Sequence, residues 1–168
     1  LSGNTNSPSF GVSGFMTLII QQATLSAAKD YLITTFVPYA SVVKIAIVAG
    51  ELALKVRVND LVYPAGDADL QPEHEVFLNE FAALMKDKDD LSLKLCAVAT
   101  AEDIGKPAGT PITEASDIQQ MNALSHKRVE NFKDYMVEEE GISSSRLLLC
   151  TPQIDSDIDA KPSLTFAS

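Results

Sequence analysis

The clearest hydrophobic pattern in the chain lies after residue 51. Apolar side chains alternate with small or charged ones over 52–58 and again over 91–97, which is the two-residue period of a strand with one buried face. Between these runs, apolar positions recur at helical spacing over 72–87, and Pro72 suits the first turn of that helix. The pattern therefore predicts a strand, a helix and a second strand.

The pattern continues to residue 167. The further predicted elements are a loop over 101–112, a helix over 114–124 capped by Thr113, a helix that Ser125 caps and Gly141 ends, a strand over 146–150, a turn over 155–160 and a strand over 163–167. This alternation of strands and helices predicts an α/β fold, an α+β two-layer sandwich with the helices on one face of a mixed sheet.

The first 50 residues have a different pattern. Gly, Ser, Asn and Pro surround short apolar pieces over 1–14, which predicts a strand, a turn and a strand. Apolar residues over 15–36 lie mostly on one helical face, until Pro38 interrupts the pattern. The apolar stretch 31–50 has three interpretations: a membrane-spanning helix, helices that pack on a larger protein, or an amphipathic segment that contacts lipid.

Charge separates the same two parts of the chain. The first 50 residues contain three charged side chains and carry +1, whereas the rest carries −11, for a net charge of −10. We therefore predict two domains, an apolar strand and helix segment over 1–50 and an acidic globular domain over 51–168. An excess of acid argues against nucleic acid as a partner, because phosphate binding needs clustered Lys and Arg.

Residues with metal-binding potential are few and scattered. His74 and His126 have no metal-ligand partner at suitable spacing, so we expect two surface histidines. The acidic turn 155–160, "DSDIDA", departs from a calcium loop at Ala160 and at Phe166, where the loop needs Gly and Glu. The sequence therefore predicts no metal site, and it offers no motif for a catalytic residue or a cofactor.

Cys96 and Cys150 fall on two strands that can be neighbours in the sheet. In an oxidising compartment they could form a disulfide. Cross-strand geometry is often poor for a bridge, so two unpaired core cysteines are the simpler expectation.

Two stretches carry a resemblance to a known family. The first is "LVYPAGDADLQPEHEVFLNEFAALMKDKDDLSLKL" and the second is "ALSHKRVENFKDYMVEEEGISSSRLLL". In their residue pattern and their order along the chain they resemble the OmpA-like C-terminal module of bacterial envelope proteins, over residues 61–149. The resemblance implies an OmpA-like β-α-β-α-β-β mixed sheet with helices on one face, here preceded by an apolar helical segment.

Ordinary OmpA-like modules bind peptidoglycan, and the resemblance implies where. An Asp and an Arg of the family hold the amine and carboxylate ends of a diaminopimelate side chain, since a carboxylate pairs with ammonium and a guanidinium pairs with carboxylate. The family's Arg falls on Arg128, but its Asp falls on Thr100, which is neutral. The family's Asn falls on Met121, with Asn122 one position late.

The loop after Thr100 is longer than the family's usual one and contains two acids. Glu102 or Asp103 could replace the missing acid if this loop folds back, and Ser125 completes the set of candidate ligand-binding residues. The alternative interpretation of Arg128 is a charge on the surface of a helix, paired with Glu130 or a neighbouring carboxylate.

The N-terminal part adds a second resemblance. "GNTNSPSFGVSGFMTLIIQQA", followed by the apolar stretch and the module, is similar to the C-terminal end of large AsmA-like envelope proteins. These in turn resemble bridge-like proteins that move phospholipid between bacterial membranes. The resemblance implies a fragment of a longer periplasmic protein that is anchored in the inner membrane, with a lipid or an envelope protein as partner.

Two functions follow from these resemblances. The first is a non-enzymatic C-terminal module with a structural, partner-contacting or lipid-contacting role in envelope lipid transport or biogenesis. The alternative is a peptidoglycan-binding anchor of the OmpA-like type.

Overall fold

The computed structural model describes residues 9–11, 16–19, 36–48 and 53–167. By its internal contacts the chain divides into two compact units, residues 1–59 with 167–168, and residues 60–166. The first unit contains one antiparallel sheet of order β1-β2-β4-β3. Its elements are β1 (Ser9–Gly11), β2 (Met16–Ile19), the 3-10 turn η1 (Val37–Tyr39), β3 (Val43–Val48) and β4 (Ala53–Val58).

The helices predicted before residue 50 are wrong where the structure describes this region. Residues 16–19 form β2, whose Met16 lies opposite Val56 of β4, and residues 43–48 form β3 on the other side of β4. Short apolar runs have no periodicity that separates a strand from a buried helix, so pairing with β4 decides. Residues 20–35 lie outside the described part. In the regions that are described, no helix is long and apolar enough to cross a membrane.

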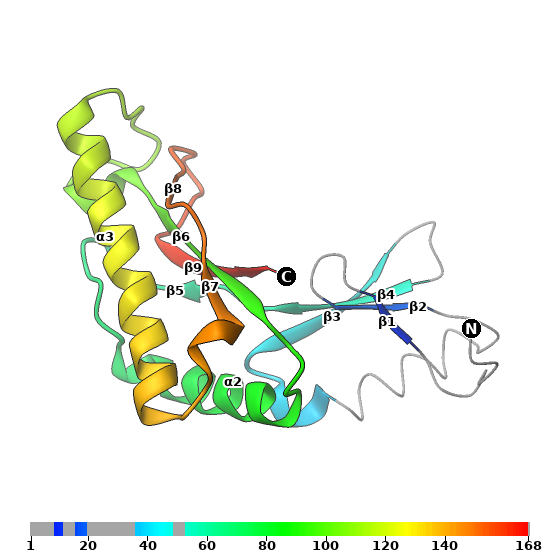
Figure 1. Cartoon of the computed structure of the whole chain (residues 1–168). Helices are drawn as coiled ribbons and strands as arrows, with labels where there is room; N and C mark the ends of the chain where they lie inside the picture. Colours follow the sequence, from blue (N-terminus) through cyan, green and yellow to red (C-terminus); the bar gives the residue numbers. More distant parts are fainter. Residues whose placement is uncertain (1–8, 12–15, 20–35, 49–52, 168) are drawn as a thin grey trace. The chain divides into compact units, whose positions relative to one another are not determined.

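The second unit alternates strands and helices (Figure 1). Its elements are β5 (Leu61–Val62), η2 (Pro72–His74), α2 (Glu75–Asp87), β6 (Leu93–Ala99), η3 (Ala101–Ile104), α3 (Ala115–Asp134), the π-helical turn η4 (Tyr135–Glu139), η5 (Ser144–Arg146), β7 (Leu147–Leu149), β8 (Gln153–Ile154) and β9 (Ser163–Ala167). The sheet has the order β5-β9-β6-β7, and β8 also pairs with β6. It is mixed, because β7 and β8 run parallel to β6 while β5 and β9 are antiparallel.

An aromatic cluster joins both helices to one face of this sheet. Phe166 of β9 packs against Phe77 and Phe81 of α2 and against Phe132 of α3, with ring centroids 5.1–5.7 Å apart. Burying four phenylalanines is a large part of the core of so small a unit, since each contributes about 1.5–3 kcal/mol. The predicted fold class is confirmed: two helices cover one face of a five-stranded mixed sheet.

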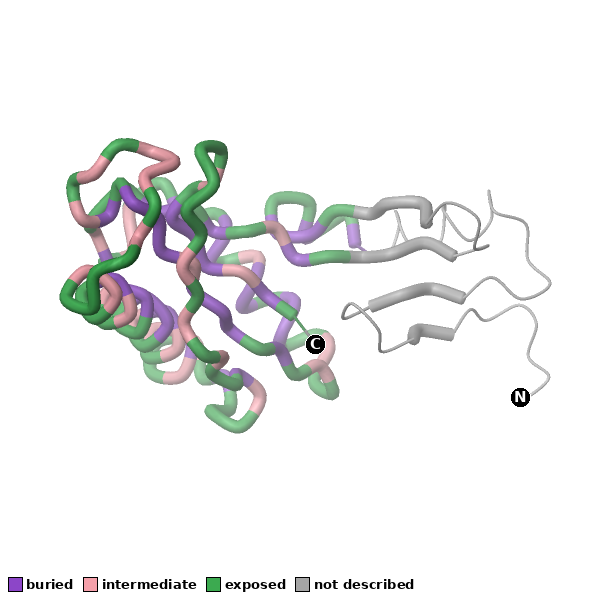
Figure 2. Tube along the Cα trace, turned by 90° about the horizontal axis from the view of Figure 1, so that it is seen from above, coloured by how far each residue is buried: buried purple, intermediate pink, exposed green. Residues whose placement is uncertain are grey.

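One long helix replaces the two that were predicted over 114–140. No Gly or Pro interrupts the chain near residue 125, and α3 runs without a break from Ala115 to Asp134. Ser125 is therefore not a cap but a fully buried residue in the middle of a helix. Figure 2 shows the resulting alternation of buried and exposed positions along this helix.

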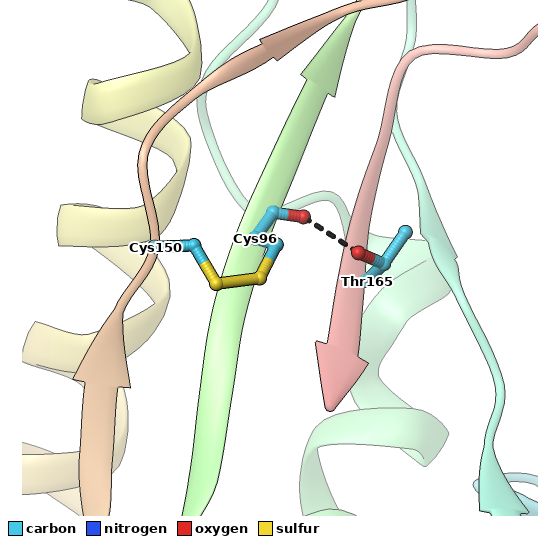
Figure 3. Close-up of a disulfide and its surroundings, with 3 residues drawn as sticks. All are labelled: Cys96, Cys150 and Thr165. Carbon is cyan, nitrogen blue, oxygen red and sulfur yellow. Dashed lines mark hydrogen bonds between the residues drawn. A yellow bond between two sulfur atoms is a disulfide. The ribbon is translucent and has the colours of Figure 1, made fainter. Parts of the chain in front are cut away.

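Cys96 and Cys150 form a disulfide, which corrects the expectation of two unpaired cysteines. Cys96 lies on β6, and Cys150 directly follows β7, the strand that runs parallel to β6 (Figure 3). The register places them side by side with their Cα atoms 4.8 Å apart, because the Cys150 amide donates to the Leu95 carbonyl. On the other side of β6, the Thr165 hydroxyl of β9 donates to the Cys96 carbonyl at 2.9 Å.

Arg146 closes the end of α2. Its guanidinium donates to the carbonyls of Met85 at 2.7 Å, Lys88 at 2.6 Å and Leu91 at 2.9 Å. The last carbonyls of a helix have no partner within the helix, so this arginine supplies the missing donors.

Candidate functional site

Arg128 lies on the buried side of α3. The buried positions of the helix are Met121, Ser125, Arg128, Val129 and Phe132, which recur at intervals of three and four residues. Arg128 thus occupies a core position and is 0% exposed, so it is not the surface charge of the alternative interpretation. Glu130, the partner proposed for it there, instead contacts His126 at 2.8 Å.

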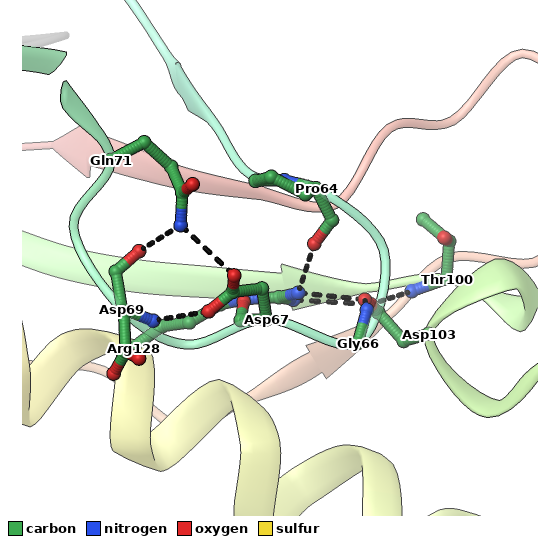
Figure 4. Close-up of polar contacts among 8 residues, drawn as sticks. All are labelled: Pro64, Gly66, Asp67, Asp69, Gln71, Thr100, Asp103 and Arg128. Carbon is green, nitrogen blue, oxygen red and sulfur yellow. Dashed lines mark hydrogen bonds and ion pairs between the residues drawn. The ribbon is translucent and has the colours of Figure 1, made fainter. Parts of the chain in front are cut away.

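The Arg128 guanidinium binds groups of this chain on every side (Figure 4). Nη1 donates to Asp103 Oδ2 at 3.1 Å and Nη2 to Asp103 Oδ1 at 2.7 Å, which is the two-point geometry of an arginine–carboxylate pair. Nε donates to the Asp67 carbonyl at 2.8 Å, and Nη2 reaches the Pro64 carbonyl at 3.3 Å. The ring of Tyr63 lies 5.1 Å from the guanidinium carbon.

Asp103 reaches Arg128 because the chain turns back directly after β6. The Asp103 amide donates to the Thr100 carbonyl at 3.0 Å, and the Asp103 carboxylate accepts the Thr100 amide at 3.0 Å. The Gly66 amide adds a further bond to the carboxylate at 2.8 Å. Burial raises the pKa of Asp103, but the bonds from Arg128, Gly66 and Thr100 outweigh burial and hold the pKa below its usual value.

The segment between β5 and η2 covers this pair. Its Pro64 and Asp67 carbonyls accept bonds from Arg128. Its Ala68 carbonyl accepts a bond from Asn131 of α3 at 2.9 Å. At the end of the segment, the Gln71 side-chain amide donates to the Asp67 carboxylate at 3.0 Å and to the Asp69 carbonyl at 2.8 Å. The Asp67 pKa lies below its usual value, first because its carboxylate accepts the Asp69 amide.

The other candidate residues differ in their burial and in how near they lie to Arg128. Thr100 is buried beside Asp103 and contributes its backbone amide, and Ser125 lies one helical turn before Arg128. Glu102 is exposed, whereas its neighbour Asp103 is the acid that meets Arg128. Asn122 is half-buried six residues before Arg128, a spacing that puts it on another side of α3.

Three hydroxyl oxygens in this region are buried without a partner. Within the described residues, the buried side-chain oxygens that make no hydrogen bond are those of Tyr63, Thr100 and Ser125. Each belongs to a residue that contacts Arg128, bonds Asp103 or precedes Arg128 by one turn. Burial raises the pKa of Tyr63 far above its usual value, and the Arg128 charge only partly offsets this. Tyr63 therefore stays protonated.

Of the two histidines, only His126 is at the surface as predicted. His74 is buried, which corrects the prediction, and its ring packs edge-on against Tyr63. Nδ1 accepts the Gln71 amide at 3.0 Å, so Nε2 carries the proton and donates to the Val62 carbonyl at 2.8 Å. This imidazole fixes both ends of the segment that covers Arg128.

Sequence reasoning missed the covering segment itself. Tyr63, Pro64, Gly66 and Asp67 were outside the candidate set, although "YPAGD" has the composition of a turn. Their hydrogen bonds with Arg128 and Asp103 span 37 to 64 positions of the chain, so no local pattern indicates them. A stronger signal existed for Arg128, since one unbroken helix would have placed it on the stripe of Met121, Val129 and Phe132.

The assembled site is an acid and a guanidinium that pair with each other at two points, with both side chains 0% exposed. Among the residues that the structure describes, no group of three His, Cys, Asp or Glu side chains could hold a metal ion.

Comparison with solved structures points to a known fold. No protein-family model matches the sequence, and no curated protein sequence matches it. Among solved structures, the chain is similar to the OmpA-like domain of FopA1 from Francisella tularensis, at 17% identity and a TM-score of 0.53, over 75% of this chain and 78% of that one. It is also similar to a putative MotB-like protein from Desulfovibrio vulgaris, at 14% identity and a TM-score of 0.54, over 84% and 91%.

These likenesses agree with the topology described above. At 14–17% identity they concern the arrangement of strands and helices and not the ligand. The chain contains an OmpA-like fold.

Proposed function

We propose that residues 60–166 form a non-enzymatic envelope module that attaches a longer protein to peptidoglycan through Asp103 and Arg128. The observation that carries this proposal is the Asp103–Arg128 pair, at 2.7 and 3.1 Å. The resemblance to OmpA-like modules implies a ligand with one ammonium and one carboxylate, recognised by an acid and an arginine. Thr100 cannot supply that acid, and Asp103, three residues later, supplies a carboxylate beside Arg128.

A zwitterionic ligand can replace this internal pair charge for charge. In the closed arrangement, Asp103 neutralises Arg128 and both are out of water. Removing one partner of such a pair leaves an uncompensated buried charge, which costs about 3–5 kcal/mol. A diaminopimelate side chain avoids that cost, because its ammonium takes the place of Arg128 at Asp103 and its carboxylate takes the place of Asp103 at Arg128. A ligand with only one of these groups leaves one protein charge unpaired.

The same proposal places the module in the periplasm. The Cys96–Cys150 disulfide supports this location, because such bonds persist in oxidising compartments and are rare in the cytosol. The fold shared with the OmpA-like domain of FopA1 is in keeping with an envelope protein. Anchoring of the parent protein in the inner membrane stays a prediction from the AsmA-like resemblance.

A second candidate is favoured by the complete burial of Arg128. Here the Asp103–Arg128 pair only holds the fold together, and the module has a structural, partner-contacting or lipid-contacting role in an AsmA-like parent. Co-sedimentation of the full chain with liposomes tests the lipid contact. Binding to liposomes without binding to sacculi would favour this second candidate.

The deciding experiment is retention of the full chain on purified sacculi, with competition by free diaminopimelate. We expect sacculi to retain the chain and diaminopimelate to release it. Cadaverine, which carries ammonium groups but no carboxylate, should release much less at equal concentration. Absence of retention, or equal release by cadaverine, would contradict the proposal. This comparison uses the unmodified chain and so does not depend on the folding of a variant.

Matched variants then locate the binding. Arg128→Lys keeps the charge but loses the two-point contact, and it should lower retention by about ten-fold or more, the effect of losing ~1.5 kcal/mol or more of charge-assisted hydrogen bonding. Arg146→Lys is the control, because it changes an arginine that also binds backbone carbonyls but lies away from Asp103. Equal loss in both variants would indicate a general effect on folding. Circular dichroism confirms that each variant is folded.

A further inference from the structure

The covering segment differs from the rest of the unit in how it is held. Pro64, Ala65, Gly66 and Asp69 are exposed, and Ala68 is the one apolar side chain that residues 64–69 bury. A segment with so little buried apolar surface depends on its hydrogen bonds, and such segments open locally far more often than the core does.

Apart from the bond from Gln71 to the Asp67 carboxylate, the tethers of this segment involve its backbone. Arg128 binds the Pro64 and Asp67 carbonyls, Asp103 accepts the Gly66 amide, and Asn131 binds the Ala68 carbonyl. Two of the groups that close the segment, Arg128 and Asp103, are therefore the charges that the proposed ligand needs. When the segment is closed, Arg128 has no exposed surface.

Both ends of the segment are fixed. At one end the Tyr63 amide donates to the Pro162 carbonyl at 2.9 Å, which ties the chain to the loop before β9. At the other end the Gln71 amide donates to His74 Nδ1 at 3.0 Å. Between them, Gly66 has φ of +76°, in the left-handed region where glycine bears no steric penalty. Residues 64–69 are therefore a loop held between two fixed points.

We infer that residues 64–69 form a lid that controls access to Arg128 and Asp103. The lid is autoinhibitory, because its carbonyls and its Gly66 amide occupy the donors and acceptors of both charges. That the ligand admitted is a zwitterion of the diaminopimelate class rests on the proposed function. The lid itself rests on the contacts of residues 64–69 alone.

The test loosens the lid without changing either charge. Asn131→Ala removes the bond to the Ala68 carbonyl, and Thr165→Val is the matched control, since it removes one half-buried bond to a carbonyl on β6. Arg128 access is followed by its rate of modification with phenylglyoxal, read by peptide mass, with exposed Arg57 as internal reference. The chain has three arginines, so each modified peptide is assigned without ambiguity.

We expect Arg128 to react slowly in the unmodified chain and about five-fold faster in Asn131→Ala, the change that the loss of ~1 kcal/mol in one hydrogen bond gives. Thr165→Val should leave the rate unchanged. An unchanged rate in Asn131→Ala, or an equal increase in Thr165→Val, would overturn the lid. If Asn131→Ala does not fold, Gln71→Ala instead removes the bonds that tie the lid residues Asp67 and Asp69 to Gln71.

Retention on sacculi separates failure of the lid from failure of the proposed function. Faster labelling together with stronger retention supports both. Faster labelling with retention that is present but unchanged overturns control of access by the lid and leaves the peptidoglycan anchor in place. Faster labelling with no retention in any variant contradicts the anchor, whereas the lid stands as a property of the fold.

Discussion

At the scale of single residues, the unit depends on groups that replace water around buried charge. Arg128 has no exposed surface, yet four hydrogen bonds and the face of Tyr63 surround its guanidinium. A desolvated charge is stable only when it is both paired and hydrogen-bonded. Asp103 meets the same condition through Arg128, Gly66 and Thr100.

Removing the arginine should therefore be costly. Arg128→Ala is expected to lower the free energy of unfolding by about 3–5 kcal/mol, because Asp103 is left buried without its partner. Lys86→Ala is the comparison, since the Lys86–Glu140 pair at 3.1 Å is exposed and its loss should change stability by about 1 kcal/mol or less. Urea denaturation measures both. Similar small losses in the two variants would show that the buried pair contributes no more than a surface pair.

The charge of Asp103 predicts a dependence on pH. Its pKa in the folded chain is below the usual value, so the unfolded chain takes up the proton first as the solution is acidified. The stabilisation is complete above the pKa of the unfolded carboxyl, about 4, and is lost as pH falls from there through the lower folded pKa. Asp103→Asn should flatten the pH dependence of unfolding in that window. An unaltered profile between about pH 2 and pH 5 would contradict this assignment.

For Ser125 we predict a substitution that raises the free energy of unfolding. Its hydroxyl is buried without a partner in the middle of α3, where alanine has the higher helix propensity. Ser125→Ala should raise the free energy of unfolding by about 1 kcal/mol, since it removes an unsatisfied polar group. Thermal unfolding of the two chains measures the difference. A loss of stability would show that the hydroxyl has a partner, such as an ordered water.

At the scale of elements, β7 is held to the sheet by few bonds of its own. It has three residues and pairs in parallel with β6, and the disulfide lies directly after it. A bridge restricts the unfolded chain most when the loop it closes is long, and this one spans 54 positions. The strand, the disulfide and the Thr165 bond to Cys96 together join β7, β6 and β9.

Reduction should accordingly weaken the unit. Replacing both cysteines, Cys96→Ser with Cys150→Ser, is expected to lower the free energy of unfolding by about 4 kcal/mol, the loop-entropy value for a bridge of this span. Denaturation with and without reductant checks the result on the unmodified chain. The double variant should show no effect of reductant. An unmodified chain that is equally stable under both conditions would contradict a structural role for the bridge.

The elements also show what the sequence could predict and what it could not. The helix over 72–87 and the strands over 91–97 and 163–167 were found because each has a clear period and a local start or stop signal. Residues 16–19 were misassigned because their partner strand β4 is distant in the chain. Residues 43–48 pair with the strand that directly follows them, but their short apolar run has no period that separates a strand from a buried helix. The site also depends on contacts that are distant in the chain. Arg128 was identified by a resemblance, but its burial depends on residues 64–69, which no local pattern connects to it.

At the scale of the whole molecule, the chain joins two compact units of different composition. The second has an OmpA-like fold, a disulfide and a net excess of acid outside its buried charged pair. Among its described residues, no group of three His, Cys, Asp or Glu side chains could hold a metal ion. Recognition of a zwitterionic group through one acid and one arginine is the function that we propose for this unit.

The most direct test follows the two amides that report on Asp103. Gly66 and Thr100 donate to its carboxylate, so their NMR signals must move when a ligand ammonium takes the place of Arg128. Titration of the full chain with a diaminopimelate-containing muropeptide should shift both signals saturably, and the amide of Thr165, on β9, should stay in place. The account is contradicted if neither amide shifts at saturating muropeptide, or if the shifts lie only at residues remote from Asp103.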